Sequence, residues 1–430
     1  MSVPANGPYE GLKVLDLSQG IAGPYCGEIL LQNGAEVIKV ESPAGDWGRG
    51  IGYGPEGMSA MAIAFNIGKR SISIDAGCEE GRKLMRRLAL QSDVLIESFR
   101  PGVMERLGLS YAELTRERPD LVYVSVTAFG PDGPYADRPG SDSTLQALTG
   151  MMVANRDSQG HPRKIGLLLV DVSTGVYAAQ ATGAALYRRA LHGKGAHVQV
   201  SLLEAAAAVQ SNGIVDEVMG GGQAARPLSV PAGTFATADG FVNVTSLHDR
   251  MFAGICRAIG KDEWASDPRF ATVELRYEHA DIINTELVRI FKTRPTGHWL
   301  RVLRENQAVC GQVNDYPQFL TDPHVLQQGI FRQVAQPGLP PLPIARVPGV
   351  PRSAAAGPAP RVGEHTREIL AGIGLDEAEI EELLETKVVT AYAPSSSGAA
   401  RWRQRAAICR CRKIRSSARN SAPVTAPRSG

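Results

Sequence analysis

Asp171 is the carboxylate whose position in the sequence best suits covalent chemistry. It stands between the apolar run Leu167–Val170 and a helix expected over Ser173–Leu191. Free N–H groups and the helix dipole stabilise an anion at a helix start, which suits a nucleophile or a base. Asp is also a preferred N-cap residue, so a purely structural cap is the competing interpretation and the more frequent one.

Asp142 and Gln146 are a second polar pair, one helical turn apart and just before Leu148-Thr-Gly150. At that spacing the two side chains share one face of a helix. They therefore either line a pocket together or belong to a polar surface. The surface is the commoner outcome for an isolated pair of this kind.

Four cations and one turn suit the binding of an anionic ligand. The cations are Lys69, Arg70, Arg100 and Arg106. Arg makes bidentate contacts with phosphate and Lys acts as a point charge, although a single surface cation is more often merely solvated. The turn at Gln19, Gly20 and Ile21 precedes an expected helix, and helix N-termini offer free N–H groups to anions.

Several familiar catalytic patterns do not occur in this sequence. All eight histidines lie at or after His161, and neither Gly-x-x-x-x-Gly-Lys-Ser/Thr nor Gly-x-Ser-x-Gly is present. These absences weaken nucleotide-hydrolase and α/β-hydrolase interpretations. Residues 52–57 fit Gly-x-Gly-x-x-Gly only formally, because they do not join a strand directly to a helix. The six cysteines lack metal-ligand spacing, so neither a metal site nor a disulfide framework is predicted.

The elements that must position these residues alternate between strand and helix along the first half of the chain. Strands are expected at Lys13–Leu17, Glu36–Val40, Ser71–Asp75, Asp93–Glu97, Leu121–Thr127 and His197–Ser201. Helical segments separate them, among them Tyr25–Gln32, Glu79–Leu90 and, after the last strand, Leu202–Val209. Strands joined by helical crossovers form parallel sheets, so the sequence predicts a doubly wound α/β domain.

The pattern changes after Gly220, Gly221 and Gly222, which suit a mobile flap or a linker equally well. Two expected strands flank Asp239-Gly240, a strong hairpin signal, and helices follow. We therefore expect a large domain over residues 1–222 and a smaller α+β domain over 223–331. The Pro/Gly-rich segment Gln336–Val362 is expected to be a linker with little regular structure.

Charge separates the body of the chain from its end. Residues 393–430 carry nine Lys or Arg and no Asp or Glu, which leaves 37 basic and 44 acidic residues before them. We expect this basic tail to be disordered. The acidic body argues against nucleic acid as a partner, and the apolar runs are too short to span a membrane. A cytoplasmic protein is expected.

Many short motifs in one order resemble the class III CoA-transferases, the carnitine and bile-acid CoA-transferase family that includes formyl-CoA transferase. The resemblance covers about residues 8–390. Its motifs are Gly11-Leu-Lys-Val-Leu-Asp16, Ala22-Gly-Pro24, Gly34-Ala-Glu-Val-Ile-Lys-Val-Glu41, Asn66-Ile-Gly-Lys-Arg-Ser71, Asp93-Val-Leu-Ile-Glu-Ser-Phe-Arg-Pro-Gly102, Gly108-Leu, Ala128-Phe-Gly130, Gly133-Pro-Tyr135, Asp171, Gly193-Lys-Gly195, Ser201-Leu-Leu, Asp239-Gly240 and Asp267-Pro-Arg-Phe270.

The resemblance implies a reaction that moves CoA from an acyl-CoA to a carboxylic acid. Asp171 would attack the thioester to give a mixed anhydride and then an aspartyl-CoA thioester, with CoA as a substrate and no tightly bound cofactor or metal. The turn at Gln19–Ile21 and the four cations would bind CoA. Asp142 and Gln146 would lie in the stretch that lines the acyl pocket, and the run Gly220–Gly222 would resemble the family's glycine loop over the aspartate.

The resemblance also implies an interlocked homodimer, in which residues 332–392 return to complete the large domain. Ser98 departs from the family's usual Asn. Two alternatives stay open: a 2-methylacyl-CoA racemase and a catalytically silent CoA-binding protein. The racemase needs a His in the segment that reads Gly140-Ser-Asp142 here, and serine cannot supply that base.

Overall fold

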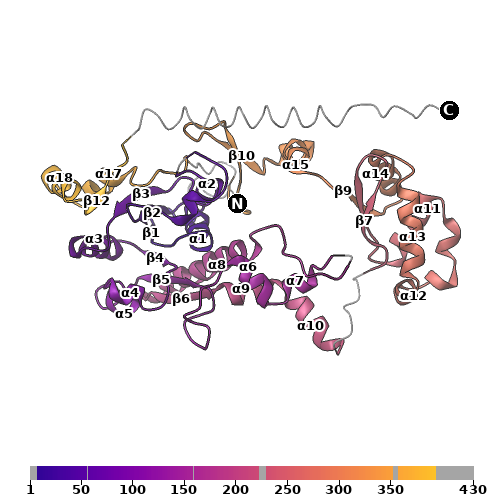
Figure 1. The fold of residues 1–430 in the computed structure, drawn as a ribbon, viewed down its shortest axis with the longest axis horizontal. Coiled ribbons are helices and arrows are strands. Elements are labelled where there is room, and N and C mark those ends of the chain that lie inside the picture. Colours follow the sequence, from indigo (N-terminus) through magenta and orange to yellow (C-terminus); the bar gives the residue numbers. More distant parts are fainter. Residues whose placement is uncertain (1–6, 56, 158, 222–228, 352–356, 394–430) are drawn as a thin grey trace, which may run out of the picture. The chain divides into compact units, whose positions relative to one another are not determined.

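The computed structural model describes residues 7–55, 57–157, 159–221, 229–351 and 357–393 (Figure 1). The chain divides into two compact units. The first takes its described residues from Met1–Gln210 and Gly329–Gly430, and the second comprises those of Ser211–Gln328. The expected boundary between residues 222 and 223 and the expected tail from residue 394 onward lie outside the described residues.

The first unit is built on a seven-stranded sheet in the order β12-β3-β2-β1-β4-β5-β6. Six strands run parallel, and β12 pairs antiparallel with β3. The strands are β1 (Lys13–Asp16), β2 (Glu36–Glu41), β3 (Arg70–Ile74), β4 (Val94–Glu97), β5 (Val122–Thr127), β6 (Ala196–Ser201) and β12 (Val389–Thr390). The strand order reverses between β1 and β4. This confirms the predicted mixed α/β fold with a large parallel sheet.

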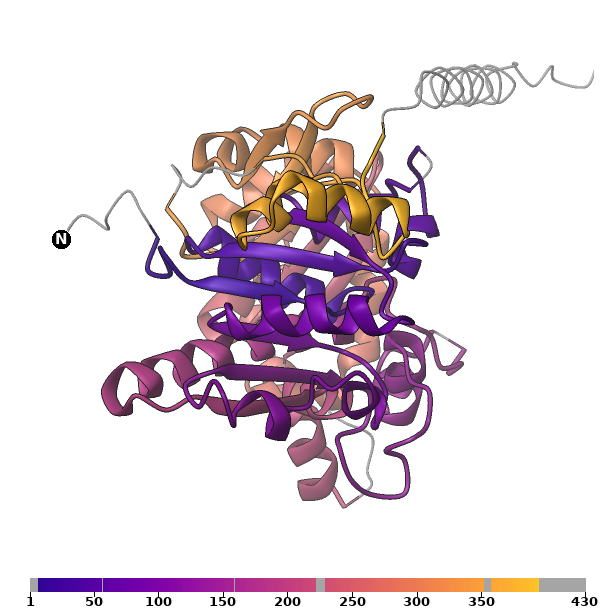
Figure 2. The same cartoon turned by 90° about the vertical axis from the view of Figure 1, so that its left-hand side faces the viewer.

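Alternation along the strands divides the apolar side chains between the two faces of the sheet. In β1, Val14 packs with α1 (Ala22–Gln32) and α8 (Leu169–His192), whereas Leu15 packs on the opposite face. Figure 1 shows helices on both sides of the strands, and Figure 2 shows α17 and α18 in front of the sheet. The opposite face carries α3 (Glu79–Leu90), α4 (Val103–Arg106), α5 (Tyr111–Leu114), α17 (Thr366–Gly372) and α18 (Glu377–Glu385).

Helix α8 packs closely on α1 because glycine stands at the points of contact. A Cβ atom built on Gly175 would lie 2.7 Å from the carbonyl oxygen of Ala22, closer than real Cβ contacts come. Farther along α8, a Cβ atom built on Gly183 would lie 2.6 Å from the hydroxyl of Tyr9, a residue that precedes β1. The small-residue composition of this helix therefore reflects the short distance between the two elements.

The described residues of the Pro/Gly-rich segment have little regular structure, as expected: β11 (Leu342–Ala345) pairs antiparallel with β10 (Phe331–Val334), and the rest forms turns and irregular chain. The structure corrects one expectation about the first unit. Helix α8 begins at Leu169, four residues before the expected Ser173. The unit also contains the 3-10 helix η1 (Trp47–Gly50) and the helices α2 (Ala60–Ala64), α6 (Asp142–Leu148), α7 (Met151–Ala154) and α9 (Leu202–Val209).

The second unit combines a three-stranded antiparallel sheet with helices. Strands β7 (Ala232–Ala236) and β8 (Phe241–Thr245) form the hairpin predicted around Asp239-Gly240, and β9 (Val309–Gln312) pairs with β8. Its helical elements are α10 (Ser211–Met219), α11 (Asp249–Ile259), η2 (Asp262–Ala265), η3 (Pro268–Phe270), α12 (Val273–Glu278), α13 (Ala280–Phe291), α14 (Thr296–Glu305), α15 (Tyr316–Thr321) and α16 (Pro323–Gln328). Among the described residues of the whole chain, no helix combines the length and apolarity needed to cross a bilayer.

Candidate active site

A crevice of about 420 Å³ opens in the first unit where the parallel strands end. The turn after β1 contributes Gln19 and Ile21, and the loop after β4 contributes Ser98–Pro101. The end of β5 and residue Asp171 of α8 complete its wall. Open α/β sheets bind ligands outside the carboxyl ends of their strands, at the point where the strand order reverses. The crevice lies at that point.

Asp171 is the third residue of α8 and not its N-cap. The N-cap is Leu168, whose side chain makes no capping hydrogen bond. No hydrogen-bond donor among the described residues reaches the Asp171 carboxylate, which is partly buried. The pKa of Asp171 is raised to about 7, first by burial and then by the nearby Asp142, while Lys164 opposes the shift. A carboxylate that is so weakly solvated costs free energy as an anion, which favours its reaction with an electrophile.

Asp142 performs the capping that Asp171 does not. One of its carboxylate oxygens accepts hydrogen bonds from the N–H groups of Val170, at 2.8 Å, and Asp171, at 3.2 Å. Its other oxygen accepts one from Gln146 Nε2 at 2.7 Å, and Gln146 Oε1 accepts the N–H of Ile165 at 2.9 Å. These bonds hold the start of α8 and the segment before it.

The positions of Asp142 and Gln146 exclude the polar-surface interpretation. They are 3 % and 0 % exposed. Neither is among the residues that line the crevice. Their contribution to the site is to place the backbone that carries Asp171.

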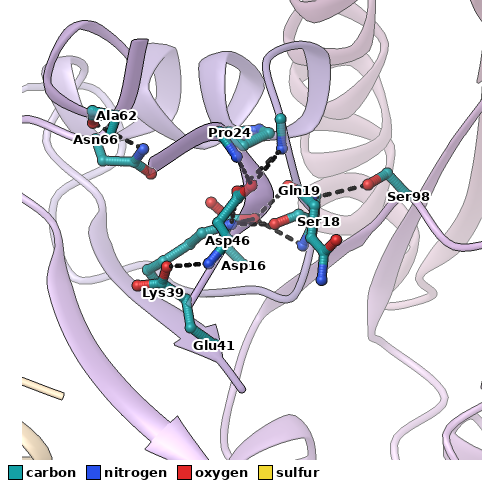
Figure 3. Close-up of polar contacts among 12 residues, drawn as sticks. Asp16, Ser18, Gln19, Pro24, Lys39, Glu41, Asp46, Ala62, Asn66 and Ser98 are labelled. Atoms are coloured by element: carbon teal, nitrogen blue, oxygen red, sulfur yellow. Dashed lines mark hydrogen bonds and ion pairs between the residues drawn. The ribbon is translucent and has the colours of Figure 1, made fainter. Parts of the chain in front are cut away.

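The turn after β1 uses the N–H groups of Gln19 and Gly20 within the protein (Figure 3). Gly20 N–H donates to both carboxylate oxygens of Asp46, at 2.9 and 3.1 Å, and Gln19 N–H donates to Ser98 Oγ at 2.9 Å. Gly20 has φ +77°, and a Cβ atom there would lie 2.4 Å from the Trp47 ring. Gln19 and Ile21 are the residues of this turn that line the crevice, along with Trp47.

The structure does not bring the four expected cations together. Lys69 is buried, and its ammonium group donates to Asp16 Oδ2, the Pro24 carbonyl oxygen and Asn66 Oδ1 at 2.7–3.0 Å. The guanidinium of Arg70 forms ion pairs with Glu36 and Glu368 instead. Arg100 lines the crevice, whereas the exposed Arg106 does not.

Two crevice residues escaped the sequence reasoning. The Arg138 guanidinium lies 3.8 Å from the centre of the Tyr135 ring and lines the crevice. Trp47 lines it as well and is 54 % exposed. The available signals were an arginine in the turn-rich segment Gly133–Gly140 and a tryptophan in the glycine-rich segment Gly45–Gly57. Arg100, Arg138 and Asp171 are the charged side chains among the described residues of the crevice wall.

The glycine run follows α10 in the second unit. Gly220 and Gly221 are exposed, and Gly221 has φ +60°. Gly222 lies outside the described residues. The expected role of this run beside Asp171 stays a prediction.

Known proteins resemble the chain over most of its length. The model of CoA-transferase family III matches residues 9–366. A succinate–glutarate CoA-transferase of Agrobacterium fabrum is 33 % identical over 85 % of this chain and 95 % of its own. An acetyl-CoA:oxalate CoA-transferase of Acetobacter aceti is 34 % identical over 78 % of this chain and 88 % of its own.

A solved structure agrees with the sequence relatives. The crystal structure of a CaiB/BaiF family protein from Brucella suis superposes with a TM-score of 0.77 at 33 % identity, and covers 86 % of this chain and all of that one. The structural match and the sequence matches thus cover most of the chain and point to the same kind of protein. The chain, with its crevice at the reversal point of the sheet, belongs to CoA-transferase family III.

Proposed function

We propose that this protein transfers CoA from an acyl-CoA to a carboxylic acid, with Asp171 as the covalent nucleophile. The observation that carries the proposal is the Asp171 carboxylate, which lines the crevice without a hydrogen-bond donor from the described residues. The names of two relatives support the reaction class, since one acts on succinate and glutarate and the other on acetyl-CoA and oxalate.

The proposed reaction begins when a carboxylate oxygen of Asp171 attacks the thioester carbonyl carbon of the donor. The C–S bond breaks, CoA leaves as a thiolate, and a mixed anhydride joins Asp171 to the acyl group. The thiolate then attacks the aspartyl carbonyl carbon. This forms an aspartyl-CoA thioester and releases the donor acid as its carboxylate.

The acceptor acid reverses these steps. Its carboxylate attacks the aspartyl thioester, expels the thiolate and forms a second anhydride. Attack by the thiolate on the acceptor's carbonyl carbon gives the new acyl-CoA and returns the Asp171 carboxylate. Each step replaces one activated acyl bond by another, so the reaction needs no external energy source as long as water is excluded from the intermediates.

The electrostatics of the site fit these roles. The start of α8 carries positive dipole charge that favours the anion formed when Asp171 is released. Asp142 occupies two of the free N–H groups there, which leaves the Asp171 carboxylate poorly solvated and reactive. We assign Arg100 and Arg138 to the CoA phosphates, because guanidinium groups suit phosphate oxygens and both line the crevice.

We further propose that the protein is a homodimer. Helix α8 exposes large apolar side chains, among them Tyr187 at 69 % and Leu191 at 59 %. Exposed apolar surface of this kind is typical of a face that another subunit covers. Light scattering should then give twice the mass of the chain.

The proposed reaction is tested by offering succinyl-CoA or acetyl-CoA with a panel of free acids that includes glutarate and oxalate. Mass spectrometry should detect a new acyl-CoA only when donor and acceptor are both present. With an acceptor labelled by ¹⁸O in its carboxylate, the first turnover should leave one heavy oxygen on Asp171, and repeated turnover should label both of its carboxylate oxygens. The peptide that contains Asp142 is the internal control and should stay unlabelled. Transfer without label on the Asp171 peptide would exclude the proposed nucleophile.

A further inference from the structure

Next to the turn after β1 lies a buried network of charged side chains, of which Figure 3 labels Asp16, Lys39 and Asp46. Asp16 is the last residue of β1 and pairs in register with Lys39 of the neighbouring strand β2. Lys39 Nζ lies 3.8 Å from Asp16 Oδ1, and Lys69 Nζ lies 2.8 Å from Asp16 Oδ2. All three side chains are at most 1 % exposed. One carboxylate is thus shared by two interior ammonium groups.

A second carboxylate balances the charge. Asp46 Oδ2 lies 3.6 Å from Lys39 Nζ, so Lys39 stands between two acids. Burial alone would raise the pKa of Asp16, but Lys39 and Lys69 hold that pKa below its usual range. Two positive and two negative groups therefore form a set with no net charge, which is the arrangement that an interior tolerates.

Asp16, Lys39 and Asp46 each bond to the turn of residues 18–21 at the crevice. Lys39 Nζ donates to the carbonyl oxygen of Ser18, and Asp16 Oδ1 accepts both the N–H and the hydroxyl of Ser18. Asp46 accepts the N–H of Gly20, and through Gly48 N–H, at 2.8 Å, it also caps the helix η1 that begins with Trp47. These hydrogen bonds therefore fix the backbone on both sides of Gln19, at Ser18 and at Gly20.

We propose that the Asp16–Lys39–Asp46 network is a positioning device that fixes the turn of residues 18–21 and the side chain of Trp47 for CoA. Lys39 is its central member, because it alone of these residues contacts both acids and the turn. The proposal rests on the proposed function, in which this crevice binds CoA. Lys69 belongs to the same device through Asp16 and serves the ligand indirectly.

The reason for expecting an effect on binding is preorganisation. Buried ion pairs contribute little net stability, but they select one backbone geometry, since any other leaves a charge without its partner. A turn that is already in its bound geometry does not have to be ordered when the ligand arrives. Loss of the network should therefore weaken CoA binding and leave the chemistry at Asp171 nearly intact.

The test uses Lys39→Met, Asp46→Asn and the double variant in the full-length protein. Each single variant leaves the buried set with one unbalanced charge, whereas the double variant removes one charge of each sign. The Asn side chain keeps an oxygen that can accept the Gly20 and Gly48 N–H groups. The double variant therefore restores the charge balance and still lacks the bond from Lys39 to Ser18.

Binding of free CoA, measured by calorimetry, should be about tenfold weaker in the double variant than in the wild type. Its KM for acyl-CoA should rise to the same extent, while its kcat and its KM for the acid should change by less than about threefold. Lys83→Met removes an exposed lysine that pairs with Glu79, and this matched control should bind CoA as the wild type does.

The outcomes separate the two proposals. A folded double variant with wild-type affinity for CoA would overturn the positioning role while leaving the transferase proposal intact. An equal loss in kcat would also overturn it, since the network would then serve the chemical step. A wild-type protein that does not bind CoA would refute the proposed function together with this inference.

Discussion

Replacing Asp171 by Asn is expected to abolish transfer and, at alkaline pH, to make the folded protein more stable. Burial and the neighbouring Asp142 raise the pKa of this carboxyl group from 3.8 to about 7 in the folded state. Between those values the folded protein retains a proton that the unfolded chain has lost. The free energy of unfolding of the wild type must then fall as pH rises through this window. Asn has no ionisable group, so the free energy of unfolding of Asp171→Asn should not show this decline.

The size of this change in the free energy of unfolding follows from the pKa shift of Asp171. At 1.36 kcal/mol per pKa unit, the two units between pH 5 and pH 7 correspond to a loss on the order of 2–3 kcal/mol. Between pH 5 and pH 8 the free energy of unfolding of Asp171→Asn should therefore rise by about that much relative to that of the wild type. Transfer activity should fall by several orders of magnitude, because an amide cannot form the anhydride.

Urea unfolding of both proteins at pH 5 and pH 8, at one protein concentration, measures the difference. Asp281→Asn is the matched control, since Asp281 is the second residue of α13 and is exposed. It should change stability by less than about 0.5 kcal/mol at either pH. An Asp171→Asn protein that is less stable than the wild type at pH 8, or that turns over normally, would refute the reasoning.

Three other perturbations test separate parts of the structure. Arg138→Ala should raise the KM for acyl-CoA about tenfold without changing the KM for the acid, and an unchanged acyl-CoA KM would remove Arg138 from CoA binding. Gly175→Ala should lower the free energy of unfolding by about 1–3 kcal/mol, because its Cβ atom would meet the carbonyl oxygen of Ala22; a thermal melt that matches the wild type would contradict the close packing. Ser141 is the N-cap of α6, so a 2-methylacyl-CoA in deuterated water should gain no deuterium at its α-carbon; rapid exchange without acid-dependent transfer would favour a racemase instead.

Local patterns predicted the six parallel strands to within one residue at each end, and some helices to the residue. Helix α3 spans Glu79–Leu90 as expected, because its apolar side chains recur at helical spacing and acidic residues fill its first turn. Strands such as β4 were recognisable as short apolar runs. The two-residue strand β12 was missed, since a strand of that length has no periodicity of its own and exists only through its partner β3.

The candidate site shows where local reasoning ends. Asp171 was selected from its position before a helix, but the helix starts earlier because a side chain 29 positions away, Asp142, caps it. Lys69 was selected because a lysine ammonium group can bind phosphate. In the folded chain the sheet brings it next to Asp16, which is 53 positions away in the sequence. Whether a charged side chain faces a ligand or the interior depends on such distant partners, which periodicity and spacing do not encode.

The antiparallel strand β12 has a consequence for biosynthesis. Thr390 hydrogen-bonds to Ser73 across 317 positions of sequence, so the edge of β3 gains its partner only after that length of chain has been synthesised. At ~5–20 residues per second this interval lasts roughly 15–60 s. During that time the β3 edge offers unpaired backbone groups to any other strand. Translation speed and chaperone supply should therefore affect the yield of this protein more than that of chains whose sheet edges are completed early.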